Sequence, residues 1–128
     1  MRFLLDTNAL LWFLVNHFRL TSNNRALIQD RNNTVFVSVA SLWEIAIKFS
    51  TGKMVSPLSF SEIVDHVVSN NSFRVLEIRM EHLRHVADLP LIHRDPFDRL
   101  LIAQSIAENL PIITSDATFD HYAIQRIW

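Results

Sequence analysis

Short runs of apolar and β-branched residues alternate along the chain with longer segments of helical periodicity. The short runs have the length and composition of strands and lie at residues 2–5, 34–39, 73–78 and 110–115, and a final apolar run, "IQRIW", ends the sequence. The segments of helical spacing lie between them, at residues 8–18, 40–54, 57–69, 81–87 and about 96–109. Strands separated by helices of this size predict an α/β fold, a three-layer α/β/α sandwich around a central, mainly parallel sheet.

Length and composition limit the classes of protein to consider. The chain has 128 residues, 49% of them hydrophobic, which predicts one domain over residues 1–128. A net charge of −1 gives no overall basic field, and the absence of cysteine excludes disulfides and fits a reducing compartment. Asp6 interrupts the apolar N-terminus, and residues 9–15 are too few to span a bilayer. We therefore expect a cytoplasmic protein with no membrane segment.

Acidic residues follow the predicted strands at the edge where parallel sheets bind ligands. Asp6 follows the first strand, Glu44 lies one helical turn beyond the second, and Asp116 follows "LPIITS". Asp95 and Asp98 open the helix that leads into that last strand, in the stretch "HRDPFDRLLIAQ". Loops at this edge converge, so these carboxylates are candidates for one site.

Each acid also has a purely structural interpretation. Asp95 before Pro96 is typical of an N-cap followed by proline at the first helical position, with Asp98 near the positive end of the helix dipole. Residues 41–44, "SLWE", fit a capping box, and Glu44 also fits an ion pair with Lys48. Caps alone do not favour acids over serine, threonine or asparagine at every strand end.

Converging carboxylates repel one another, and a bound divalent cation removes that repulsion. Oxygen ligands without cysteine or a clear histidine pair favour Mg²⁺ or Mn²⁺ over Zn²⁺. Such a cation suits phosphoryl chemistry, because it lowers the pKa of a water and neutralises charge on the phosphate.

Four stretches, "LLDTNALLW", "SVASLWEIAIKFSTGKM", "HRDPFDRLLIAQS" and "LPIITSD", together resemble the PIN domain, and specifically the VapC-type toxins of bacterial toxin–antitoxin pairs. The resemblance implies a PIN-like α/β/α fold and a ribonuclease that depends on Mg²⁺ or Mn²⁺. It also implies a cognate antitoxin that blocks the site. The family's acidic positions fall on Asp6, Glu44, Asp98 and Asp116, as metal ligands and catalytic residues, with Asp95 as second choice to Asp98.

Further roles are predicted around these ligands. Thr7 and Ser115 resemble the hydroxyl residues that support the family's metal ligands. Lys48, Arg94 and Arg99 are candidates for RNA contact, although a solvated loop or ordinary ion pairs would explain them equally well. His93 precedes the cluster in the same polar loop, where solvation is the ordinary role.

Aromatic and apolar residues of the helical segments carry two more expectations. Trp12 and Trp43 sit in apolar helical runs, which predicts core positions. "ALLWFLVNHF" has more apolar faces than one helix of a small domain buries, which indicates a partner surface, either a second copy in a homodimer or the antitoxin.

Two rival functions remain open at this stage. An interaction domain whose acids are only helix caps would explain the same residues without catalysis. A phosphatase of the haloacid dehalogenase type also places an aspartate after its first strand, but its usual second aspartate, two positions on, is Asn8 here.

Overall fold

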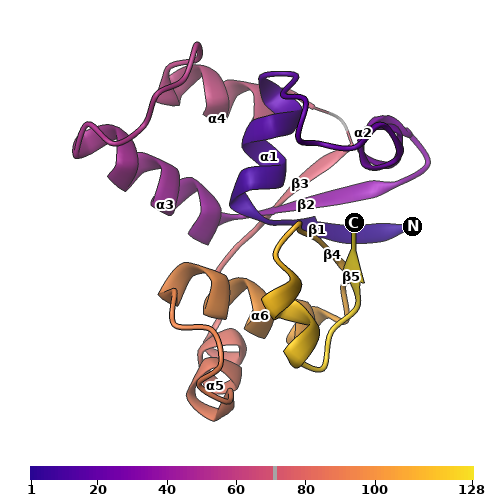
Figure 1. Cartoon of the computed structure of the whole chain (residues 1–128), viewed down its shortest axis with the longest axis vertical. Coiled ribbons are helices and arrows are strands. Elements are labelled where there is room, and N and C mark those ends of the chain that lie inside the picture. The colour runs from indigo at the N-terminus through magenta and orange to yellow at the C-terminus, as the bar shows by residue number, and fades with distance from the viewer. Residues whose placement is uncertain (71) are drawn as a thin grey trace.

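The computed structural model describes residues 1–70 and 72–128 and has a five-stranded sheet at its centre (Figure 1). In spatial order the strands are β3 (Phe73–Leu76), β2 (Thr34–Ser38), β1 (Arg2–Leu5), β4 (Ile112–Ile113) and β5 (Arg126–Ile127). All four pairings between these strands are parallel, and β1 lies in the middle. The predicted α/β fold with a mainly parallel sheet is confirmed.

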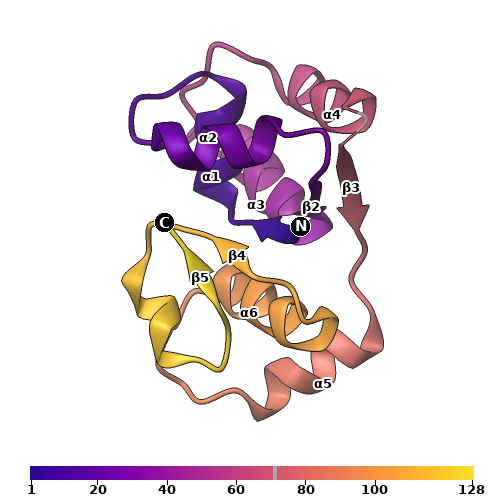
Figure 2. The same ribbon diagram turned by 90° about the vertical axis from the view of Figure 1, so that its right-hand side faces the viewer.

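Helices cover both faces of the sheet (Figures 1 and 2). One face carries α1 (Thr7–Leu14), α2 (Ser22–Gln29), α3 (Val39–Ser50) and α4 (Phe60–Ser69). The other carries α5 (Met80–Asp88), α6 (Pro96–Glu108) and the 3-10 helix η1 (Ala117–His121). This arrangement is the three-layer sandwich that the alternating segments predict.

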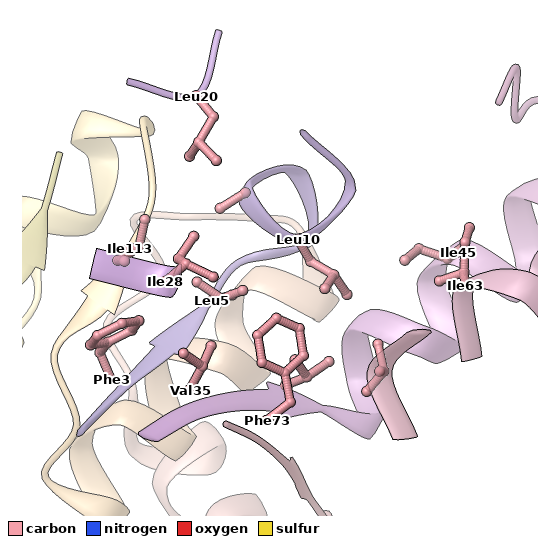
Figure 3. Close-up of a cluster of buried hydrophobic side chains, with 13 residues drawn as sticks. Phe3, Leu5, Leu10, Leu20, Ile28, Val35, Ile45, Ile63, Phe73 and Ile113 are labelled. Carbon is pink, nitrogen blue, oxygen red and sulfur yellow. The ribbon is translucent and has the colours of Figure 1, made fainter. Parts of the chain in front are cut away.

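Two hydrophobic cores form because successive strand residues point to opposite faces of the sheet. Phe3 and Leu5 enter the core beneath α1 to α4, whereas Leu4 between them enters the core beneath α6. Figure 3 shows side chains of β1, β2 and β3 gathered with Leu10 of α1 in the first of these cores. The same alternation fixes the register of β1, since a slip of one residue would exchange its two faces.

Backbone conformation sets several helix ends. Helix α1 ends at Leu14, earlier than predicted, because Asn16 adopts a positive φ of 54° and turns the chain. Asn109 closes α6 with a φ of 52°, and Gly52 follows α3 with a φ of 70°, where glycine carries no steric penalty.

Two features depart from the predictions. The sequence predicts no element where the structure has helix α2, "SNNRALIQ", because apolar residues are few in this segment; in the structure the helix buries only Asn24 and Ile28. Trp43, predicted as core, is 56% exposed, whereas Trp12 is partly buried against the first core. Among residues 1–70 and 72–128, no helix combines the length and apolarity needed to cross a membrane.

Truncation in the second core is expected to destabilise the fold. Leu101 of α6 has no exposed surface, so Leu101→Ala removes buried methyl groups and leaves a cavity, at a cost of about 2–5 kcal/mol. Val55→Ala is the matched control, since Val55 is 98% exposed and its loss creates no cavity. Denaturant unfolding followed by circular dichroism measures both variants, and equal stability of the two would contradict the assigned core.

Candidate functional site

The parallel sheet brings the predicted acids to one edge. In β1, Leu5 pairs with Val37 of β2 and with Ile113 of β4, so the three strands end side by side. Asp6 continues directly from β1, and its backbone N–H donates to the carbonyl of Ile113 at 3.1 Å. The segments that follow these three strands therefore start within one small region.

A cavity of about 200 Å³ opens at this edge. All four predicted ligands, Asp6, Glu44, Asp98 and Asp116, line it. The remaining lining residues are Thr7, Asn8, Lys48, Asp95 and Ser115. Carboxylates more than 90 positions apart in the sequence thus share one polar cavity, as the sequence pattern predicts.

Asp6 is the most buried of these acids, with 6% of its surface exposed. It caps α1, accepting a hydrogen bond through Oδ1 from the backbone N–H of Ala9 at 2.7 Å. Burial raises the pKa of Asp6 to about 6, against the lowering effect of hydrogen bonds from Thr114 and Ala9. The negative charges of Asp116 and Glu44 add to this increase.

His93 lies between two of the acids. Its Nε2 is 3.0 Å from Oδ2 of Asp98 and 3.0 Å from Oδ2 of Asp116. One ligand atom from each of the three residues lies within 4.8 Å of the others, which is compact enough for a shared metal ion. The sequence alone allows a solvated loop position or a phosphate contact for His93, but it does not predict this position between two acids.

The loop before α6 holds His93 in place. The hydroxyl of Tyr122 accepts from the backbone N–H of His93 at 2.7 Å and donates to the carbonyl of Pro90 at 2.9 Å. The ring of His93 also packs edge-on against Phe119, which is buried in the second core. Tyr122 and Phe119 lie more than 20 positions from His93 in the sequence, so no local pattern predicts these contacts.

Asp95 and Asp98 differ in what their carboxylates do. Asp95 is the N-cap of α6, and its Oδ1 accepts from the backbone N–H groups of Phe97 at 2.8 Å and Asp98 at 3.2 Å. Asp98 caps nothing and extends to His93 instead. Burial, and then the charge of Asp95, raise the pKa of Asp98 to about 7, despite the opposing effect of His93.

Asp116 combines a cap with a cavity position. Its Oδ1 accepts from the backbone N–H of Thr118 at 2.9 Å, while Oδ2 is the atom next to His93. Burial alone would raise the pKa of Asp116, but the bonds from Thr118 and His93 outweigh it and hold that pKa below its ordinary value.

Glu44 does not form the capping box that residues 41–44 suggest. Ser38 is the N-cap of α3, and its hydroxyl accepts from the N–H of Ala40, so Glu44 lies inside the helix. The hydroxyl of Thr7 donates to Oε1 of Glu44 at 2.7 Å, and Nζ of Lys48 is 3.4 Å from Oε2. Thr7 and Lys48 therefore both orient this carboxylate.

The three predicted RNA contacts are placed differently. Lys48 lines the cavity, and Arg94 is exposed in the loop before α6. Arg99 reaches the carbonyl oxygens of four residues, Val86, Leu89, Pro90 and His93, at distances of 2.9–3.4 Å. Its guanidinium thus braces the loop that carries His93.

The donor set of this cavity fits a hard divalent cation. Its acidic members supply oxygen atoms, and burial together with the charges of neighbouring acids raises the pKa values of Asp6 and Asp98, so a bound cation would favour their ionised forms. Mg²⁺ and Mn²⁺ prefer such oxygen ligands, and His93 adds a nitrogen that Mn²⁺ also accepts.

The fold and cavity define a class, parallel α/β proteins with an acidic cavity at the carboxyl edge of the sheet. The PIN domain family model matches residues 3–125, so the chain belongs to the PIN domain family. It is 31% identical over 64 residues to "Ribonuclease VapC16" of Mycobacterium tuberculosis. That match covers 50% of this chain and 45% of the relative, so the chain spans about half of its length.

Two solved structures share the fold over nearly the whole chain. VapBC2 from Rickettsia felis, bound to a DNA fragment from its promoter, has a TM-score of 0.75 at 19% identity, covering 99% of this chain and 98% of that one. A toxin–antitoxin complex from Klebsiella pneumoniae has a TM-score of 0.62 at 13% identity, covering 98% and 96%. The PIN-like fold expected from the sequence is confirmed.

The raised pKa of Asp6 predicts a pH-dependent stability of the metal-free protein. The Asp6 carboxyl group binds its proton more tightly in the folded protein than in the unfolded chain. Its contribution to the free energy of unfolding therefore falls as pH rises from about 4 towards 6. The lost stability is on the order of 3 kcal/mol, since one pKa unit corresponds to about 1.4 kcal/mol.

Asp6→Asn isolates this contribution, because asparagine caps helices equally well and does not titrate. The comparison is needed because His82, whose pKa burial lowers, changes stability in the opposite direction in part of the same range. Chemical unfolding between pH 4.5 and 7.5 in a chelator measures the free energy of unfolding of both proteins. As pH rises, the value for Asp6→Asn should increase relative to that of the original protein. A constant difference would contradict the assigned pKa.

Proposed function

We propose that this chain, acting as a single domain over residues 1–128, is an Mg²⁺- or Mn²⁺-dependent endoribonuclease and the toxin of a toxin–antitoxin pair. The observation that carries the proposal is the cavity in which Asp6, Glu44, Asp98 and Asp116 meet. Membership of the PIN domain family and the likeness to a curated ribonuclease support the choice of RNA as substrate.

Asp6, Glu44, Asp98 and Asp116 would hold the cation, directly or through water, with His93 as a further donor. When bound, the cation lowers the pKa of a water and neutralises charge on the scissile phosphate. Glu44, which Thr7 and Lys48 orient, is placed to align that water as a general base. Attack at phosphorus breaks the bond to the 3′-oxygen, which takes up a proton, and leaves a 5′-phosphate.

Positive groups around the cavity are proposed to position the RNA backbone. Lys48 is 40% exposed and lines the cavity, so it can contact a phosphate when Glu44 is engaged elsewhere. Arg94, exposed in the loop before α6, is a second such group. Arg99 is a weaker candidate for this contact, because backbone carbonyls already occupy its guanidinium.

A cognate antitoxin and a second copy of the chain are the proposed protein partners, and the cytoplasm is the proposed location. The fold likeness to a toxin–antitoxin complex from Klebsiella pneumoniae supports the first partner. Exposed apolar residues at Met80 and Leu83 of α5 and at Phe18 after α1 give surfaces for either. If the antitoxin inhibits RNA cleavage when it binds, that result would fit a partner that covers the cavity.

Metal binding by the cavity is expected to stabilise the protein. Mg²⁺ or Mn²⁺ well above its dissociation constant should raise the melting temperature, since it binds the folded state alone. Asp98→Asn should remove most of this increase, because it deletes a carboxylate that reaches into the cavity.

Asp95→Asn is the matched control for Asp98→Asn. Asparagine preserves the N-cap of α6, so the melting temperature and its metal response should both remain near those of the original protein. Thermal melts with and without metal measure both variants. A metal response lost in Asp95→Asn and kept in Asp98→Asn would reverse the assignment of these two aspartates.

RNA cleavage is expected from the free protein in the presence of Mg²⁺ or Mn²⁺, and not in excess chelator. Asp6→Asn should lower the rate by about 100-fold or more, because even residues behind metal ligands account for 10- to 100-fold effects. Mapping the ends of cleaved RNA gives the rate and the position of the phosphate. Equal cleavage by both purified proteins would refute the site, and no metal-dependent cleavage or metal binding would favour an interaction domain.

A further inference from the structure

Trp43 is an exposed tryptophan whose neighbour in sequence lines the acidic cavity. It directly precedes Glu44 on α3, and 56% of its surface is open to solvent. Isolated exposed hydrophobic residues are common and need no function. The position of Trp43 is less ordinary, because its neighbour in sequence is one of the carboxylates that line the cavity.

Phe97 of α6 packs against the indole of Trp43. The two ring centroids are 5.0 Å apart and their planes meet at 75°, an edge-to-face arrangement that is favourable for aromatic pairs. Phe97 directly precedes Asp98, just as Trp43 precedes Glu44. Helices α3 and α6, on opposite faces of the sheet, thus approach each other here through one aromatic pair (Figure 1).

Two parallel rows of side chains run along α3 beside this pair. Glu44 and Lys48, one turn apart, line the cavity. Trp43 and Ile47, also one turn apart, form the neighbouring row and are exposed. A polymer with phosphates on one side and flat apolar groups on the other matches these two rows, because Lys48 supplies positive charge beside the indole.

We propose that Trp43 stacks on a nucleobase next to the scissile phosphate of a single-stranded RNA, with Phe97 fixing the indole. The inference rests on the proposed ribonuclease function and names a contact of its substrate. Stacking on an aromatic ring accepts any base, since each base has a π-face. Trp43 therefore contributes affinity and positioning, while the choice of sequence lies elsewhere.

The test measures RNA binding separately from cleavage. In the Asp6→Asn background, Trp43→Ala is titrated with a short single-stranded oligoadenylate and with the same backbone carrying abasic residues, both in Mg²⁺. Loss of the indole should weaken oligoadenylate binding by about 5- to 150-fold, the range that one stacked base represents. Binding of the abasic backbone should not change, because it offers nothing to stack.

Conservative and matched variants guard against a structural effect. Trp43→Phe should restore part of the affinity for oligoadenylate, since phenylalanine still stacks. Trp128→Ala, which removes another exposed tryptophan, should bind like the parent. RNA should also quench the indole fluorescence of the parent and of Trp128→Phe, and quench it less in Trp43→Phe.

Several outcomes would overturn the proposal. Equal affinity of the parent and Trp43→Ala for oligoadenylate would do so, as would equal losses with the base-containing and abasic chains. A variant that binds RNA normally and loses only its antitoxin would assign Trp43 to a protein interface. If the parent binds neither RNA, the stacking contact fails, whereas the ribonuclease function is tested separately by the cleavage assay on the original protein.

Discussion

Parallel pairing of β1 with β2 and β4 is the constraint on which the rest of the structure depends. Because β1 carries apolar residues on both faces, helices must cover the sheet above and below. Because the strands are parallel, each connection must return the chain to the same end of the sheet, usually through a helix. The same pairing makes β1, β2 and β4 end together, with Leu5 beside Val37 and Ile113. A hydrophobic requirement at the centre thus determines where the polar residues that follow the strands must meet.

Helix capping and the acidic cavity use the same residues but different oxygen atoms. Asp6, Asp95 and Asp116 each accept backbone N–H groups through Oδ1. In Asp116 the second oxygen faces His93, so one carboxylate both starts η1 and contributes to the cavity. The structural and functional interpretations of these acids are therefore compatible. Glu44 and Asp98, which cap nothing, have no such structural role to explain them.

The sequence predicted the sheet and most helices, because local periodicity determines them. It also predicted that Asp6, Glu44, Asp98 and Asp116 meet, because the ends of parallel strands lie at one edge of the sheet. It did not predict the position of His93, which Tyr122 and Phe119 create from distant parts of the chain. It placed Trp43 in the core because an apolar helical run does not reveal which face stays uncovered. Such outcomes depend on tertiary contacts rather than on local pattern.

The excess of carboxylates over positive groups in the cavity favours the binding of a cation. Five carboxylates line the cavity, whereas Lys48 is its one lysine and His93 lies between only two of the acids. Burial raises the pKa values of Asp6 and Asp98, and the negative charges of neighbouring acids add to the increase. Serine or asparagine would cap α1 at position 6 as well as aspartate does, and Asp98 does not cap α6, so helix capping alone does not require a carboxylate at either position. Retention of carboxylates therefore favours a site whose charge is balanced by something bound, either protons at low pH or a cation near neutrality.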